Sequence, residues 1–327
     1  MVDVLHVPFI FFPDPSGGTE VYVDGLVRAL RSQGFEGAVA APANADAEYD
    51  HNEIRVFRSA KTASADLSYA YGMPDERAAR SFHAVLGRVR PRIVHIHAHT
   101  AAVSELLVDA AHDAGAKVVF TYHTPTVSCA RGTMLLMGRS PCDGKIDVKR
   151  CSVCVLASHG VPAGLRNLIT AMPRGLGEAL HTAGMSGSTV TALRIPALLE
   201  SGYRRFRSMS GKIDCMVAVC EWVRDVLRRN GVPENKIELC RQGLPHGGST
   251  AMPEPAVSGI KAGEPLTVGY FGRLDATKGV DVLVEALRRA PEANVRLRIY
   301  GVRQAGSEAY ARQLEVAGTR DRRIIME

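Results

Sequence analysis

One stretch near the end of the chain constrains the fold more than any other, the segment 266–280 with the sequence LTVGYFGRLDATKGV. Its first part, Leu266–Tyr270, is short, apolar and partly β-branched, which predicts a buried strand that ends at Gly272. The apolar residues that follow recur at helical spacing and predict a helix from near Gly279: Val280, Leu283, Val284 and Leu287. The segment is therefore predicted to be a strand–turn–helix unit of an α/β domain.

Two cations, Arg273 and Lys278, lie on the turn between this strand and this helix. Backbone N–H groups and the positive end of a helix dipole already favour an anion at such a turn. Arginine adds a planar fork for phosphate oxygens and lysine adds a compact point charge. We therefore predict a diphosphate site here; the alternative is a solvated loop with two surface cations.

A second glycine-containing turn lies near the N-terminus, where Val2–Phe9 is predicted to be a strand and 19–33 a helix. Gly17 and Gly18 between them allow the backbone to approach a phosphate without a Cβ clash. The pattern is not G-x-G-x-x-G, so no dinucleotide cofactor is inferred from it.

Histidines mark the ends of two further predicted strands. His123 follows the strand Lys117–Tyr122, and ligands of doubly wound sheets bind outside such carboxyl ends. Its titration range suits proton handling, although a histidine that only caps the strand is the alternative. His95, His97 and His99 alternate along the strand 92–97 and are predicted to share one face, where packing and a place near a cleft are favoured over a metal site.

Two of these motifs resemble those of a known family. The segment Phe271–Gly279 resembles the donor-phosphate loop of retaining GT-B glycosyltransferases of glycosyltransferase family 4, and the sequence Gly-Gly-Thr-Glu at 17–20 resembles the second phosphate loop of that family. The resemblance implies two Rossmann-like doubly wound α/β domains facing a cleft, and transfer of a sugar from a UDP- or GDP-linked donor with retention of configuration. It implies that Arg273, Lys278 and the backbone of Gly18 contact the donor diphosphate without a catalytic metal. His123 matches the family's strand-end Thr-x-His, which implies a catalytic place beside the transferred sugar.

The chain of 327 residues is long enough for two domains. We predict an N-terminal acceptor-side domain at 1–243, a linker rich in Pro, Gly and Ser at 244–263 and a partial nucleotide-sugar-binding domain at 264–327. In the resembling family a pair of glutamates with seven residues between them binds the sugar and ribose. Glu308 and Glu315 have six residues between them and come too early to replace that pair, so we expect a fragment or a natural truncation. The alternative function is a catalytically inactive domain that binds an acceptor, a partner or zinc.

Four cysteines fall in a predicted insertion at about 124–156: Cys129, Cys142, Cys151 and Cys154. The last two form Cys-Ser-Val-Cys, which predicts a turn that directs two thiolates at one ion. Four thiolates are the ligand set of a closed structural zinc site, and unligated thiols or an iron–sulfur cluster are the alternatives. A redox or metal module built on these cysteines is a third hypothesis for the function.

Charge and composition bear on the partners. The net charge of +6 favours anionic partners, such as a nucleotide or an anionic membrane surface, and nucleic acid is not predicted because no basic run is interleaved with aromatics. No apolar stretch approaches the length of a membrane span, which predicts a cytoplasmic protein with peripheral membrane contact at most. The acceptor is left open among a sugar, a lipid and a polysaccharide. Loops are expected at 43–50 and 60–71, where they can contact an acceptor, and helices broken by prolines are expected at 160–211.

Overall fold

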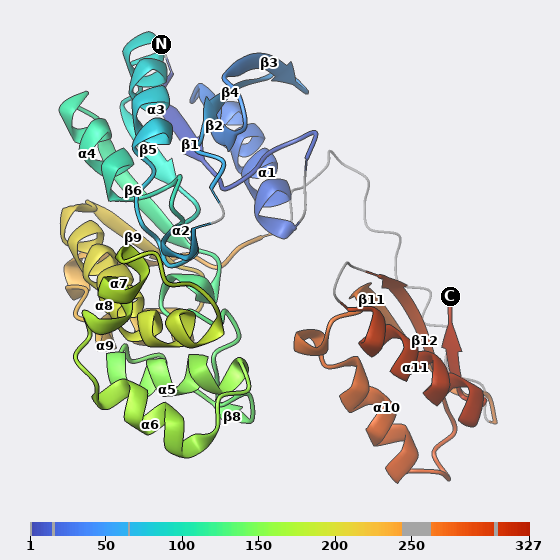
Figure 1. Cartoon of the computed structure of the whole chain (residues 1–327). Helices are drawn as coiled ribbons and strands as arrows, with labels where there is room; N and C mark the ends of the chain where they lie inside the picture. Colours follow the sequence, from blue (N-terminus) through green and yellow to red (C-terminus); the bar gives the residue numbers. More distant parts are fainter. Residues whose placement is uncertain (1, 15–16, 65, 244–262, 304–306) are drawn as a thin grey trace. The chain divides into compact units, whose positions relative to one another are not determined.

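The computed structural model describes residues 2–14, 17–64, 66–243, 263–303 and 307–327 (Figure 1). The chain divides into two compact units, Met1–Gly247 and Gly248–Glu327. Nearly all of the predicted linker, residues 244–262, lies outside the described residues.

The first unit is built on an eight-stranded sheet with the strand order β10-β9-β6-β5-β1-β2-β4-β3. Every pairing is parallel except that of β3 with β4 at the edge. The strands are β1 (Val4–Val7), β2 (Gly37–Ala43), β3 (Ala47–His51), β4 (Ile54–Ala60), β5 (Ile93–Ile96), β6 (Lys117–Tyr122), β9 (Cys215–Ala218) and β10 (Ile237–Leu239). The short hairpin β7 (Leu135–Leu136) with β8 (Ser140–Pro141) lies apart from this sheet.

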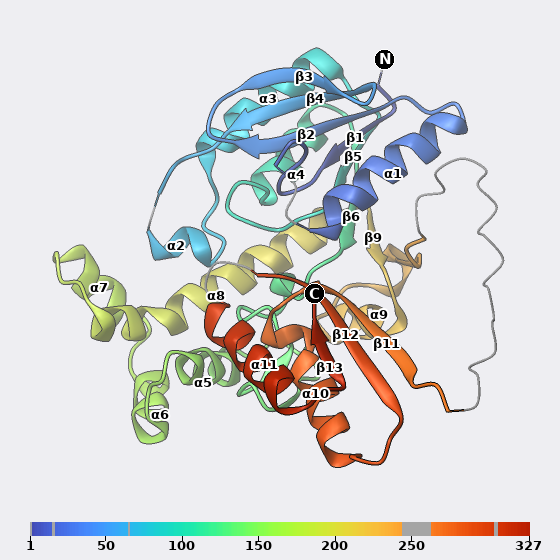
Figure 2. The same ribbon diagram turned by 90° about the vertical axis from the view of Figure 1, so that its right-hand side faces the viewer.

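Helices cover the sheet on both faces (Figure 2). Ala38 and Ala40 pack in the core cluster formed with α3, α4, α8 and α9, whereas Val39 and Ala41 pack with α1, because successive strand residues point to opposite faces. The helices are α1 (Gly18–Ser32), α2 (Leu67–Ala70), α3 (Glu76–Val89), α4 (Glu105–Asp113), α5 (Val148–Ser158), α6 (Ala163–Ala171), α7 (Leu176–Thr182), α8 (Ser188–Lys212) and α9 (Glu221–Arg229).

The strand order identifies the edge of this sheet where a ligand is expected. The chain leaves β1 toward β2 through α1, and it later adds β5, β6, β9 and β10 on the other side of β1. The order therefore reverses between β1 and β5, and in open α/β sheets the crevice at the carboxyl ends of such strands receives the ligand.

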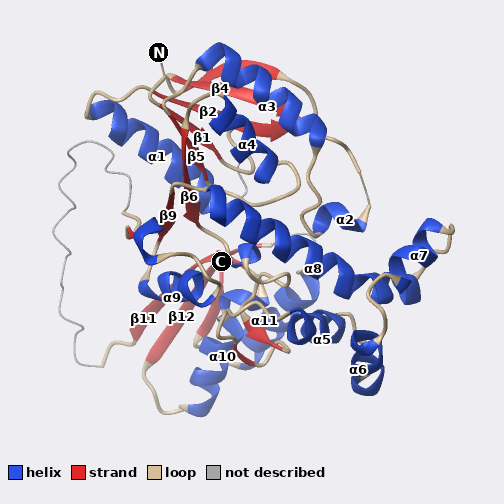
Figure 3. Cartoon of the chain, turned by 90° about the vertical axis from the view of Figure 1, so that its left-hand side faces the viewer, coloured by secondary structure: helices blue, strands red, loops and turns tan. Residues whose placement is uncertain are grey.

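Several predictions of local structure were wrong. Segment 43–50 contains most of the edge strand β3, none of whose residues is buried, so no buried apolar residue marks this strand in the sequence. Segment 60–71 contains the short helix α2. Pro196 lies inside the 25-residue helix α8 without ending it, and it is buried. The packing of α8 against α4, α5 and α7 (Figure 3) supports a helix that lacks one backbone hydrogen bond.

The second unit has a three-stranded parallel sheet in the order β11-β12-β13. Its elements are β11 (Leu266–Arg273), α10 (Val280–Arg289), β12 (Val295–Val302), α11 (Glu308–Arg320) and β13 (Ile324–Met326). Strand β11 continues through Gly272, beyond its predicted end, because its pairing with β12 extends to Arg273 and Val302. The prediction that this strand is buried is wrong: most of its residues are exposed and the others are only partly buried. Within the described part of the chain, no helix is long and apolar enough to cross a membrane.

Candidate functional site

The N-terminus of α1 forms one side of the candidate site in the first unit. Gly17 caps this helix, and its N–H donates to Glu20 Oε2 at 3.1 Å, so the carboxylate of Glu20 is used in the cap. Gly18 is the first helical residue, and a Cβ on it would meet no atom within 4 Å. Nothing in the described chain demands glycine at position 18, whereas a ligand held against the first N–H groups would.

Tyr22, one helical turn beyond Gly18, connects this helix end to His123. The rings of Tyr22 and His123 lie edge to face, with centroids 5.1 Å apart. His123 follows directly after β6, as predicted, and so lies at the carboxyl end of a strand beside the point where the strand order reverses. The structure thus brings Gly18 and His123 to one edge of the sheet.

A chain of hydrogen bonds leads from His123 into the core. His123 Nε2 lies 2.9 Å from His97 Nδ1, and His97 Nε2 lies 3.1 Å from His6 Nδ1. At the outer end, His123 Nδ1 lies 2.6 Å from the amide nitrogen of Gln242, just after β10. Both ring nitrogens of His123 are thus occupied, and a ligand can bond to Nδ1 only by displacing Gln242.

The three hydrogen-bonded histidines, His6, His97 and His123, are neutral because they are largely buried. Burial lowers the pKa of His6 to about 3 and that of His123 to about 4. The pKa of His97 is also lowered well below 6.5, by burial first and then by the neighbouring imidazoles. At neutral pH His123 is therefore a hydrogen-bonding group without charge, and it is too weak a base for efficient general-base catalysis.

Neutral imidazoles allow only two proton arrangements along this chain. Each histidine contributes one N–H, and each contact needs one proton, so all the protons point either toward His6 or toward Gln242. With the amide nitrogen of Gln242 facing His123, they point toward His6. His6 Nε2 is buried and has no hydrogen-bond partner in the described structure, so the series of hydrogen bonds ends at this atom.

Three histidines, two of them buried and one partly buried, lie close enough together to be considered as metal ligands. One ring nitrogen each of His6, His95 and His97 lies within 4.8 Å of the others. His6 and His95 are neighbours on β1 and β5, whereas His99 leaves the shared face and lies near Phe206. The prediction that three alternating histidines share one face thus holds for His95 and His97 and is wrong for His99. His95 Nε2 bonds Thr121 Oγ1 at 2.7 Å, and packing accounts for this side chain.

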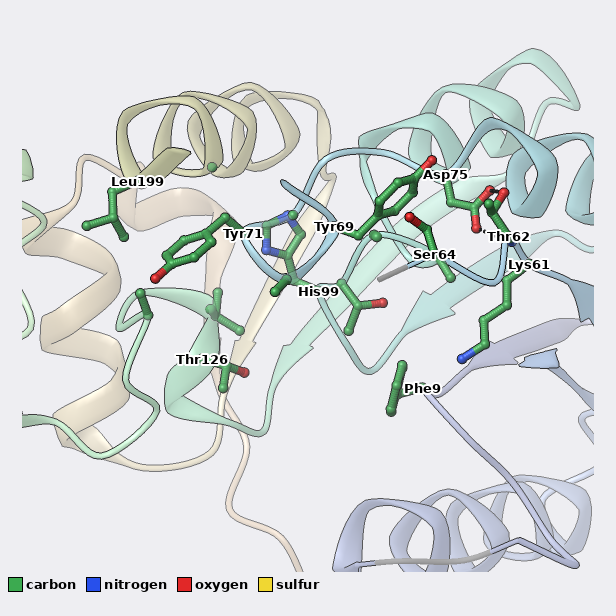
Figure 4. Close-up of a pocket in the computed structure, with 18 of the residues that line it drawn as sticks. Phe9, Lys61, Thr62, Ser64, Tyr69, Tyr71, Asp75, His99, Thr126 and Leu199 are labelled. Carbon is green, nitrogen blue, oxygen red and sulfur yellow. Dashed lines mark hydrogen bonds between the residues drawn. The ribbon is translucent and has the colours of Figure 1, made fainter. Parts of the chain in front are cut away.

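A cavity of about 420 Å³ lies at the same carboxyl-terminal edge of the sheet (Figure 4). It is lined by segments that follow β1, β4, β5 and β6 and by α2 and α8. Aromatic and hydroxyl side chains face it: Phe9, Tyr69, Tyr71, Thr62, Ser64 and Thr126. His99 also lines it, and its Nε2 is buried without a hydrogen-bond partner in the described structure. The cavity can therefore receive a ligand that carries hydroxyl groups.

Asp75 lines the cavity but has a structural role. Burial alone would raise the pKa of its carboxyl group, yet hydrogen bonds from Thr62 and from the first N–H groups of α3 outweigh burial and lower the pKa. The carboxylate caps α3 and accepts from Thr62 N at 2.6 Å and from Thr62 Oγ1 at 2.8 Å. Asp75 therefore fixes the 60–71 segment against the helix.

In the second unit, Arg273 ends β11 and Lys278 closes a short 3-10 turn, Ala276–Lys278. Leu274 between them is 1% exposed, and its N–H donates to Val302 O at 2.9 Å. Gly279 follows with a φ of 69° and is the N-cap residue of α10. The predicted strand–turn–helix is confirmed, with both cations on one connection anchored in the core by Leu274.

The four cysteines of the insertion line one small cavity of about 30 Å³. The prediction that Cys-Ser-Val-Cys forms a turn is wrong, because Cys151 and Cys154 lie in α5, whose N-terminus is capped by Asp147. The mixture of charged, glycine and apolar residues around this helix hides its periodicity, and packing against α8 supplies the stability.

Sequence reasoning missed three residues of the candidate site. They are Tyr22 on α1, His6 on β1 and Gln242 after β10. The position of His6 on β1, next to the strand that carries His95, is the signal that could have indicated the cluster.

Comparison with known proteins extends these observations. A family model described as the glycosyl transferase 4-like domain matches residues 17–243. Among curated proteins, no significant sequence match was found.

Solved structures resemble the chain at low identity. Anabaena HepE in complex with UDP is 13% identical with a TM-score of 0.56, and the match covers 99% of this chain and 68% of HepE. The catalytic domain of starch synthase IV from Arabidopsis thaliana, bound to ADP and acarbose, is 12% identical with a TM-score of 0.51 over 99% and 73% of the two chains. The lipopolysaccharide outer core galactosyltransferase WaaB is 12% identical with a TM-score of 0.50 over 99% and 67%.

These structures confirm the predicted α/β class with GT-B relatives. The match of the family model over most of the chain shows the family itself. The chain therefore belongs to the glycosyl transferase 4-like family.

Proposed function

We propose that this protein transfers a glycosyl group from a nucleotide-sugar donor to a hydroxyl group of an acceptor, with retention of configuration. The observation that carries the proposal is the placement of Gly18 and His123 at the carboxyl-terminal edge of the first sheet, the edge that also carries a cavity rich in aromatic and hydroxyl groups. Such a place fits a sugar at the edge of the sheet.

In this proposal the donor diphosphate is bound by Arg273, Lys278 and the backbone at Gly18. A diphosphate that leaves a sugar gains negative charge, and fixed cations and N–H groups aimed at it stabilise the transition state. Similar solved structures carry UDP or ADP, which supports a nucleoside diphosphate as the ligand class. The family resemblance implies UDP or GDP as the nucleotide of the donor. The two protein cations act in place of a catalytic metal.

His123 is proposed to hydrogen-bond the transferred sugar or the accepting hydroxyl. Since burial lowers its pKa to about 4, it acts as a neutral group that orients the hydroxyl. Binding of the sugar would replace the bond to Gln242, so Gln242 holds the imidazole in place until the ligand arrives.

The acceptor is proposed to enter the cavity that Figure 4 shows. Tyr69 and Tyr71 offer flat apolar faces, while Thr62 and Ser64 offer hydroxyl groups, a combination that suits the two sides of a sugar ring. A sugar, a glycolipid or a polysaccharide end would all present this chemistry.

Thermal-shift measurements with UDP, GDP and ADP test the donor part, and assays of donor hydrolysis and transfer test the reaction. We expect one of these nucleoside diphosphates to stabilise the protein selectively, because a ligand that binds only the folded state raises the melting temperature. No stabilisation by any nucleoside diphosphate and no turnover would refute the proposal and favour the inactive binding domain.

A further inference from the structure

A cavity outside the candidate glycosyl-transfer site gathers four of the seven cysteines of the chain. Cys129 follows the 3-10 turn after β6, Cys142 follows the β7–β8 hairpin, and Cys151 and Cys154 lie on α5. Cys154 is buried and the other three are partly buried, and all four are free thiols. Three separate segments of the chain thus meet at one sulfur-lined space.

Local structure fixes the backbone of each cysteine. Cys129 N donates to Pro125 O and Cys142 N donates to Met134 O, each at 2.8 Å. Cys151 and Cys154 are three residues apart and so lie on the same side of α5.

Gly144, two residues after Cys142, occupies a position that only glycine can take. It has a φ of 74°, and a Cβ there would lie 2.5 Å from Val226 Cγ2, so only glycine fits. The backbone beside Cys142 is therefore held against α9 by close packing.

Hydrogen-bond donors and cations lie beside the sulfurs of this cluster. Cys154 Sγ accepts from Met137 N at 3.2 Å, and Arg131 Nη1 lies 3.6 Å from the same sulfur. Arg150 and Lys145 also line the cavity. Donors and cations directed at sulfur stabilise a metal-bound thiolate and tune its charge.

We propose that Cys129, Cys142, Cys151 and Cys154 bind one zinc ion in a closed structural site. Four soft ligands from a short, irregular segment match the tetrahedral thiolate sites that zinc prefers. Binding replaces four S–H protons by one Zn²⁺, and the net charge of −2 on the tetrathiolate lies beside Arg131 and Arg150.

The sulfurs must move together to bind the ion. Among the described residues, no three of these sulfurs all lie within 4.8 Å of one another, whereas Zn–S bonds of about 2.3 Å in a tetrahedron place sulfurs about 3.8 Å apart. Rotation of the cysteine side chains into the 30 Å³ space brings them closer. Zinc therefore tightens a segment whose backbone the fold has already positioned.

The proposed zinc site has a consequence for the acceptor cavity. Ala130 and Tyr203 line both cavities, so the cysteine-bearing segment forms a shared wall. Zinc bound on one side would fix the position of Tyr203 on the other. This consequence depends on the proposed function, whereas zinc binding itself does not.

Metal analysis of the tag-free chain by mass spectrometry tests the site without any activity assay. We expect about one zinc per chain, lost in Cys151→Ser and Cys154→Ser and retained in Cys215→Ser, whose cysteine lies on β9 outside the cavity. Thiol titration of the folded wild-type chain gives a second measurement that needs no variant. Before a chelator is added, only the three cysteines outside the cavity should react: Cys215, Cys220 and Cys240.

Each contrary result would overturn the zinc proposal. Such results are a metal-free chain with seven reactive thiols, iron with visible colour, a disulfide within the cluster, or a Cys215→Ser variant that loses zinc as fully as Cys154→Ser. A zinc-loaded chain without transferase activity would leave this proposal intact and contradict only the proposed function.

Discussion

Buried neutral histidines make the first unit sensitive to acid, and His99→Gln tests how much one of them contributes. Burial lowers the pKa of His99 to about 4, from an ordinary value of 6.5. As the pH falls through 6.5, the unfolded chain binds a proton at this residue while the folded chain does not. The contribution of His99 is therefore fully present above pH 6.5 and is lost as the pH falls toward 4.

The expected magnitude follows from the two pKa values. At pH 5 the difference in proton binding costs about 2 kcal/mol for His99, and His6 and His123 add about the same each. A total of about 6 kcal/mol is comparable with the whole stability of an ordinary domain. The first unit should therefore be far less stable at pH 5 than at pH 7.

Urea unfolding followed by the fluorescence of Trp222 measures this effect. Trp222 is the only tryptophan and lies on α9, so it reports on the unit that holds the histidines. The loss of unfolding free energy between pH 7 and pH 5 should be about 2 kcal/mol smaller in His99→Gln than in the wild type. His83→Gln, which removes an exposed imidazole on α3, should leave the loss unchanged. An equal pH dependence in wild type and His99→Gln would refute the reasoning.

The remaining predictions concern the donor loop and His123. Arg273→Ala should raise the donor KM and lower kcat, and kcat/KM should fall about 10- to 150-fold because one charged hydrogen bond is lost. The control variant Arg296→Ala on β12 should leave kcat/KM unchanged, and equal kinetics of the two variants would contradict the phosphate role. His123→Ala should lower kcat with His123→Asn partly restoring it, and wild-type kcat should not vary with the charge of His123 between pH 6 and 8; a kcat that follows a titration near 7 would show that His123 is not neutral. Gly301→Ala should destabilise the second unit by about 1–3 kcal/mol, because the added Cβ would lie 2.2 Å from a methyl group of Leu274. Gly318→Ala on α11, where the nearest atom is 3.6 Å away, should be neutral or stabilising. Urea unfolding compares the two variants, and equal effects would contradict the packing argument.

The sequence by itself determined the local units and their chemistry. The sequence pattern placed β6 with the bounds that the structure has, and it placed the strand–turn–helix that carries Arg273 and Lys278. These elements could be predicted because strand and helix leave distinct periods in the sequence and because glycine and charged residues mark the turns.

Only the tertiary structure decided which distant residues meet. His6, His97, His123 and Gln242 come from four separate elements, and their hydrogen-bonded chain depends on the strand order, which no local pattern contains. The depressed pKa of His123 likewise depends on burial, which comes from packing around it. The cysteines could be recognised from their spacing, but the fold alone places them around one cavity that shares a wall with the candidate acceptor site.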